Sequence, residues 1–200
     1  ARFYTHSGID LVSLARVAVK TIALQRSSQG GGSTITQQLA KQLYSEKAET
    51  TYERLLQKPI EWVIAVELER SYTKEEILML YLNYFDFLYN AVGIRTASQV
   101  YFGKLPSQLS IEESATLVGM CKNPSYFNPV RRNERTRLRR NVVLSQMEKS
   151  GFLTSAEKDS LQALPLKLNF KRVDHKQGLG TYLREYLRTY MTAKEPRKSR

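Results

Sequence analysis

The sequence contains few side chains that bind soft metals and almost none that can form disulfides. Its 200 residues include one cysteine and two histidines, so an intrachain disulfide and an all-cysteine zinc site are excluded. It also lacks a run near the roughly 20 apolar residues of a membrane-spanning helix, because Arg16 and Lys20 interrupt the best candidate, Leu11 to Leu24. Chemistry at a soft metal is therefore disfavoured.

Acidic residues are scarce relative to basic ones. The 31 Lys and Arg residues outnumber 19 Asp and Glu residues, which gives a formal net charge of +12. Such a balance suits an anionic partner: a nucleic acid, a phospholipid surface or a phosphorylated substrate. Between Lys122 and Asn141 there are seven basic residues and one acid. This run forms either a solvated helix surface or an anion-binding one.

Strand patterns are absent, whereas helix start signals recur. Four segments have a Ser or Thr followed three residues later by Glu or Gln, which is a capping box whose side chains satisfy free backbone N–H groups. The pairs are Thr34 with Gln37, Thr73 with Glu76, Ser110 with Glu113, and Thr154 with Glu157. Asp10 is placed to cap a further helix over Leu11 to Gln25. These signals predict an all-α fold.

Two more helices follow from apolar spacing. One runs from about Arg54 or Pro59 to Ser71, and the other runs from about Glu134 to Lys149 and stops at Gly151. The expected apolar residues are Ile60, Val63, Ile64 and Leu68 in the first helix, and Leu138, Val142 and Met147 in the second.

Polar segments divide the chain. Residues 27–32 are rich in Gly and Ser and predict a functional loop, whereas residues 45–52 have no apolar period and predict a flap. After Pro165 the apolar pattern thins. We expect one domain over residues 1–165, and a linker over residues 166–200 that leads toward a downstream domain.

The glycine-rich loop runs directly into a predicted helix, from Gln29 to Lys41. Glycines allow a ligand to approach the backbone, and the first turn of a helix presents N–H groups and positive charge to an anion. Lys41 adds a full charge two turns along. A flexible linker before a capped helix explains the same residues equally well. A P-loop is excluded because its Gly-x4-Gly-Lys-Ser/Thr pattern is absent.

Residues 31–41 resemble the Gly-Gly-Ser-Thr-Ile-Thr-Gln-Gln-Leu-x-Lys motif of the peptidoglycan glycosyltransferases, family 51, which occur in class A penicillin-binding proteins. Four further motifs of that family are matched in order within residues 3–115, and looser similarity through Asn141 extends the resemblance to about three quarters of the chain. They are Phe3 to Asp10, Lys58 to Glu69, Lys74 to Lys104, and Leu109 to Ala115.

The resemblance implies a fold and a reaction. The fold would be a mostly α, two-lobed, lysozyme-like domain. The reaction would be a processive, inverting transfer of a glycan from polyprenyl pyrophosphate to lipid II, at the outer face of the cytoplasmic membrane. The partners would be these lipid-linked glycans and the membrane surface, with no nucleic acid, and a transpeptidase domain would commonly follow.

The resemblance also assigns site residues. Glu61 corresponds to the carboxylate that steadies the leaving pyrophosphate, directly or through a divalent cation such as Mg²⁺ or Mn²⁺, and no other cofactor is expected. The substrate-binding positions are Ser33, Thr34, Gln38, Lys41, Lys58 and, one position out of the common register, Arg54. The general base would be a Glu two residues before Ala1, so the 200-residue chain alone is expected to be inactive.

The remaining assignments concern supporting roles. His6 is expected to support the loop that holds the base, and Asp10 to cap a helix. Helical periodicity alone would choose Glu67 as the functional acid, because it lies in the middle of the predicted apolar stripe, with Glu61 at its edge and Glu69 on the far side. The motif favours Glu61, since Lys58 lies one turn before it.

Two other functions explain part of the sequence. A lysozyme-like lytic transglycosylase would also be helical and use a Glu, but it has no leaving phosphate for Lys41 and Lys58 to neutralise. A basic helical nucleic-acid-binding module would explain the net charge and the Lys122 to Asn141 run. It would leave the glycine-rich loop and the Lys58-x-x-Glu61 pair unexplained.

Overall fold

The computed structural model describes residues 2–22, 32–44, 50–172, 186 and 189–190. This part of the chain is mostly helical, and its extended pairing is confined to one isolated bridge between Asp86 and Val92. The predicted α class is therefore confirmed. The α-helices are α1 (Leu11–Ile22), α2 (Ile35–Tyr44), α3 (Thr51–Ser71), α4 (Lys74–Tyr84), α5 (Ile94–Phe102), α6 (Ile111–Met120), α7 (Asn133–Lys149) and α8 (Ser155–Ala163), with 3-10 turns η1 (Arg2–Thr5) and η2 (Pro106–Gln108).

Three of the predicted capping boxes are complete, at Thr34, Thr73 and Thr154. At Ser110 only half of the box forms, because the backbone N–H donates to the Glu113 carboxylate while Ser110 Oγ has no partner in the described part. A fifth box starts α3 at Thr50 with Glu53. The prediction of a flap over residues 45–52 is therefore wrong for its last residues, because Thr50 caps α3 and the helix starts at Thr51. Residues 45–49 lie outside the described residues.

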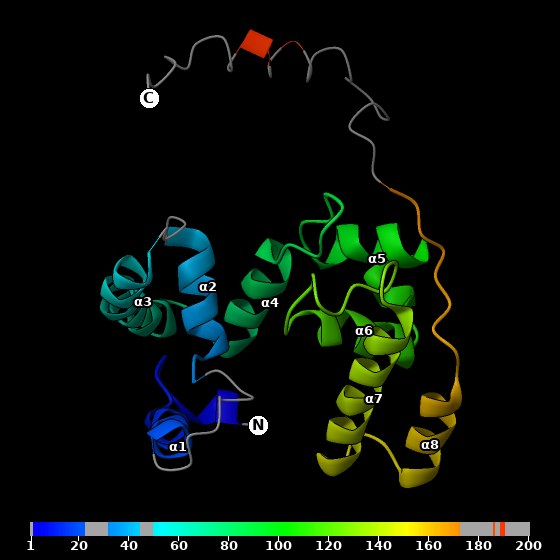
Figure 1. Ribbon diagram of the computed structural model, residues 1–200, viewed down its shortest axis with the longest axis horizontal. Helices are drawn as coiled ribbons and strands as arrows, with labels where there is room; N and C mark the ends of the chain where they lie inside the picture. Colours follow the sequence, from blue (N-terminus) through cyan, green and yellow to red (C-terminus); the bar gives the residue numbers. More distant parts are fainter. Residues whose placement is uncertain (1, 23–31, 45–49, 173–185, 187–188, 191–200) are drawn as a thin grey trace.

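Helices α2, α3, α4, α5 and α6 share one hydrophobic core. Figure 1 shows α1, α2 and α3 gathered on one side, α5 to α8 on the other, and α4 between the two groups. Fully buried residues come from both sides, including Leu39 on α2, Ile77 on α4, Tyr101 on α5 and Met120 on α6. No helix among the described residues is long and apolar enough to cross a membrane.

The predicted buried face of α3 is half right: Leu68 is buried and Ile64 packs against the core. Ile60 and Val63 are 58% and 71% exposed, whereas Glu61 and Ala65 are buried at 2% and 0%. This face is covered because α2 packs against α3 and Gly8 lies against the Ala65 backbone. In α7, Met147 packs against buried Leu144 as predicted, whereas Leu138 and Val142 are exposed. The other buried residues of this helix are Thr136 and Arg140.

The chain continues to pack after α8. Leu168 and Phe170 contact the main core, and the backbone N–H groups of Asn169 and Lys171 donate to carbonyls of α5 at 3.0 and 2.8 Å. The predicted boundary at residue 165 stays a prediction, but the next few residues are attached to the domain. Most of the predicted linker, including residues 173–185, lies outside the described residues.

Candidate functional site

The start of α2 is fixed in place by Thr34. Its hydroxyl accepts from the Gln37 N–H at 3.1 Å and donates to the Gly8 carbonyl at 2.7 Å. The Gln37 side chain accepts from the Thr34 N–H in return, at 3.2 Å. The helix N-terminus, with its positive end, is thereby held beside Ser33, while residues 23–31 of the glycine-rich loop lie outside the described residues.

An ion pair within α3, whose carboxylate is buried, lies against this N-terminus. Lys58 Nζ is 2.5 Å from Glu61 Oε2, with the Lys58 side chain 36% exposed and the Glu61 side chain 3% exposed. Lys58 Nζ also donates to Ser33 Oγ at 3.4 Å. The structure thus brings together three of the residues predicted from the motifs, Ser33, Lys58 and Glu61, from segments 25 residues apart.

This arrangement suits the binding of an anion. The buried carboxylate holds the ammonium in one position, and the ammonium stays partly open to solvent. A fixed cation beside a helix N-terminus and a hydroxyl is a preorganised place for negative charge. Nothing in this trio can supply a strong general base, since the Glu61 carboxylate is already paired.

Other predicted binding residues lie farther along α2. Gln38 accepts a hydrogen bond from the Tyr81 hydroxyl at 3.1 Å, and burial raises the pKa of Tyr81, which keeps it a phenol donor. Lys41 is exposed in the last turn of α2 and has no ion pair or hydrogen bond with the described residues. At 1.5 Å per residue it lies about 9 Å along the axis from Ile35, the first residue of α2. Arg54 belongs to α3, but its side chain lies outside the described residues.

The first motif, Phe3 to Asp10, packs against the start of α2 and against α3 through the backbone of Gly8. Asp10 caps α1 as predicted, since its carboxylate accepts from the Ser13 N–H at 3.1 Å and from the Ser13 hydroxyl at 2.6 Å. Gly8 has φ +91°, and a Cβ at this position would lie 2.8 Å from the Ala65 carbonyl oxygen. Only glycine lets the segment approach α3 this closely.

Glu69 is the acid that sequence reasoning missed. It was placed on the far side of α3, yet its side chain is 6% exposed. It accepts from the Thr36 hydroxyl at 2.6 Å, and its other oxygen lies 2.6 Å from Lys74 Nζ. Lys74 also donates to the His6 carbonyl at 2.6 Å. Glu69 therefore links α2, α3, α4 and the first motif, and its signal was present in the motif residues Leu68-Glu69 and Lys74.

Glu67, favoured by periodicity, has no such role. Its side chain is 69% exposed and its contact is a 3.9 Å ion pair with Arg70 on the same helix. The periodic prediction failed because the stripe of Ile60 and Val63 faces solvent, so the middle of that stripe is also exposed.

His6 is expected to be neutral at pH 7. Burial and the positive charge of Lys74 lower the pKa of His6 below the ordinary 6.5, against the opposing effect of Glu69. A group with a lowered pKa in the folded state contributes stability above its unfolded pKa and loses it as the pH falls through the folded value. We therefore expect the free energy of unfolding to fall as the pH decreases from about 6.5.

An NMR titration of the imidazoles measures this directly, with His6 assigned by comparison with His6→Asn. Urea unfolding at about pH 7 and about pH 5 gives the linked stability change, which should be smaller in His6→Asn. A His6 pKa above 6.5 would contradict the arrangement around Lys74.

Glu61 has few neighbouring groups that could bind a divalent cation with it. Among the described residues no cluster of three or more His, Cys, Asp or Glu side chains comes together, and Glu61 Oε2 contacts Lys58. Mg²⁺ in phosphate-transfer sites is bound by one or two carboxylates with the substrate phosphates. The described residues do not form a metal site by themselves.

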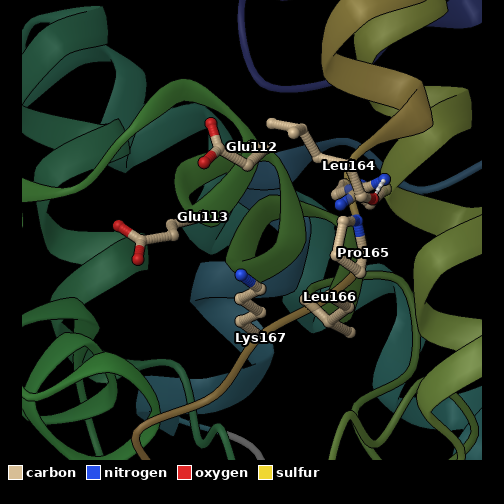
Figure 2. A pocket seen from close by; sticks show the side chains of 7 residues that line it. Glu112, Glu113, Leu164, Pro165, Leu166 and Lys167 are labelled. Carbon is tan, nitrogen blue, oxygen red and sulfur yellow. Dashed lines mark hydrogen bonds between the residues drawn. The ribbon is translucent and has the colours of Figure 1, made fainter.

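A separate pocket of about 240 Å³ lies on the other side of the molecule. Figure 2 shows Glu112, Glu113 and Lys167 around it, with Leu164, Pro165 and Leu166 along one side. Arg140, fully buried, also lines it and donates to the carbonyls of Gln162 and Leu164 at 3.1 and 2.7 Å. By donating to these carbonyls, Arg140 caps the C-terminal end of α8, so its role is structural.

Comparison with known proteins gives a consistent result. The family profile described as Transglycosylase matches residues 1–148. Penicillin-binding protein 1A of Escherichia coli is 41% identical over 85% of the chain, and penicillin-binding protein 1F of Bacillus subtilis is 35% identical over 91%. These alignments cover 19% and 25% of the two relatives, so the chain spans about a fifth to a quarter of their length.

A solved structure is also similar. The crystal structure of penicillin-binding protein 1A from Haemophilus influenzae matches 81% of the chain and 20% of its own, with 26% sequence identity and a TM-score of 0.49.

Proposed function

Because the chain belongs to the transglycosylase family, whose profile it matches over residues 1–148, we propose that it polymerises lipid II into peptidoglycan glycan strands. The transfer is processive and inverting, with polyprenyl pyrophosphate as the leaving group, and takes place at the outer face of the cytoplasmic membrane. The matching fold would be the two-lobed, lysozyme-like one.

The observation that best supports this proposal is the position of Lys58. Its ammonium is held by buried Glu61 at 2.5 Å, next to Ser33 and the N-terminus of α2, and remains partly exposed. Charge develops on the pyrophosphate as the glycosidic bond breaks, and a fixed cation stabilises that charge in the transition state. Glu61 orients the cation, which is a positioning role. Thr34, Gln38, Lys41 and Arg54 are proposed as additional donor contacts.

The other half of the reaction needs a base. The attacking sugar hydroxyl is a poor nucleophile at neutral pH, and a positioned carboxylate contributes about 10²–10⁴ in rate. We assign this role to a Glu two residues upstream of Ala1. The first motif, fixed by Lys74 at the His6 carbonyl and by Gly8 against α3, would hold that Glu close to the donor site.

Incubation with lipid II tests the function. A chain extended upstream to include the Glu two residues before Ala1 should elongate glycan and release polyprenyl pyrophosphate, and the 200-residue chain should not. Equal activity of the two chains would overturn the assignment of the base. Shortening of added glycan would favour the lytic reaction, and inactivity of the extended chain toward lipid II would overturn the proposed function.

A further inference from the structure

An ordered cluster of arginines lies at the start of α7, away from the α2–α3 site. We call it the arginine–aromatic patch and define it by its members: Tyr126, Phe127, Arg131, Arg132, Arg135 and Arg139. The two aromatic residues come from the connection between α6 and α7, and the arginines from the end of that connection and from the first two turns of α7. The sequence predicted either a solvated surface or an anion-binding one for this run.

Aromatic rings, and not acids, contact three of these arginines, Arg132, Arg135 and Arg139. The guanidinium carbons of Arg135 and Arg132 lie 4.3 and 5.6 Å from the centre of the Tyr126 ring. Arg139 lies 5.7 Å from the centre of the Phe127 ring, and the two rings pack edge to face at 4.9 Å. A guanidinium stacked on a ring keeps its N–H edges free to donate to phosphate oxygens. The stacking therefore preorganises the donors without neutralising them.

The patch keeps its positive charge. Glu134, the one acid in this stretch, is paired with Arg137 at 3.0 Å. None of the four patch arginines forms an ion pair with the described residues. Arg131, Arg132 and Arg135 are exposed. A solvated helix surface has no need of aromatic rings beneath its charges, so the solvated interpretation leaves the stacking unexplained.

Apolar surface is exposed among these charges. The Tyr126 side chain is 46% exposed and Val130 is 41% exposed. Aromatic and aliphatic side chains surrounded by arginines are typical of proteins at the interface between lipid headgroups and acyl chains. Nucleic acids also attract arginines, but an exposed valine between them gains nothing from a phosphate backbone.

We propose that the arginine–aromatic patch docks on an anionic phospholipid surface, with its arginines on lipid phosphates and with Tyr126 and Val130 at the headgroup level. The patch is distinct from the proposed donor site, which lies on α2 and α3. It would attach the domain to the bilayer that carries its proposed substrate, through residues far in sequence from the donor site.

Vesicle binding of the 200-residue chain tests the proposal. Phosphatidylcholine vesicles with and without phosphatidylglycerol are sedimented with the chain, and the bound fraction gives a partition coefficient. Each arginine near an anionic surface contributes roughly a fivefold gain in partitioning. The double variant Arg132→Gln, Arg135→Gln should therefore bind about thirtyfold more weakly to the phosphatidylglycerol vesicles.

The matched control removes the same charge elsewhere. Arg95→Gln with Lys149→Gln changes two exposed basic residues outside the patch and should lose much less affinity. Equal losses in the two double variants would overturn the proposal, because binding would then depend on net charge alone. Binding that does not require phosphatidylglycerol would also overturn it. So would a duplex oligonucleotide that binds more tightly than the vesicles with the same arginine dependence, which would indicate a nucleic-acid surface.

Discussion

Glu61→Gln is expected to lower the rate of glycan polymerisation by about 10²–10³-fold, the range found when one electrostatic group is removed from an active site. The substitution keeps the shape of the buried side chain and removes its charge. Lys58 Nζ, now 2.5 Å from a carboxylate, would lose its anionic partner and its fixed position beside Ser33. The rate is measured with lipid II in the upstream-extended chain.

Glu67→Gln provides the matched control. It lies on the same helix, carries the same charge and is 69% exposed, with one long contact to Arg70. Its rate should stay within about twofold of the parent, as for most surface substitutions. Because Lys58 is one-third exposed and can be hydrated, Glu61→Gln should remain folded. A folded Glu61→Gln chain with the parent rate would show that this carboxylate has no part in the reaction.

Gly8→Ala is expected to destabilise the fold by about 3 kcal/mol, from left-handed backbone strain of roughly 1–2 kcal/mol and overpacking of a similar size. Gly8 has φ +91°, and its new methyl group would lie 2.8 Å from the Ala65 carbonyl oxygen and 2.9 Å from the carbonyl carbon. Both atoms belong to helix backbone, which cannot move aside as a flexible side chain can. Urea unfolding monitored by circular dichroism measures the change.

Gly151→Ala separates the two causes. Gly151 has a similar φ of +79°, but no atom lies within 4 Å of the added methyl. It should lose only about 1 kcal/mol, from backbone strain alone. Equal losses at the two positions would contradict the close packing of the first motif on α3.

Capping boxes predicted the starts of helices well because the two residues of each box are close in sequence. A hydroxyl at Thr73 or Thr154 meets its partner three residues away, whatever the rest of the chain does. The capping box at Thr50 carries the same signal and was overlooked within a polar stretch. Which face of a helix is buried depends on partners far along the chain, and a short stripe such as Ile60 and Val63 does not reveal them.

The candidate site was found through motif resemblance and not through periodicity. Glu61 is buried although it lies at the edge of the apolar stripe, because Lys58 compensates its charge within one helical turn. The Glu69 side chain is also mostly covered, at 6% exposed, but its compensating Lys74 lies on the next helix. A charge that is paired across two helices looks like a solvated residue in a one-dimensional pattern, and only tertiary structure distinguishes the two.

The attachment of the first motif also has a kinetic consequence. Thr34 bonds to Gly8 across 26 residues, and Lys74 bonds to the His6 carbonyl across 68 residues. Contacts that close such long loops form late, after the local helices exist. Substitutions at Gly8 or Lys74 should therefore accelerate unfolding and leave the folding rate nearly unchanged. Among the described elements, the segment around His6 and Gly8 would therefore be the one that becomes ordered last.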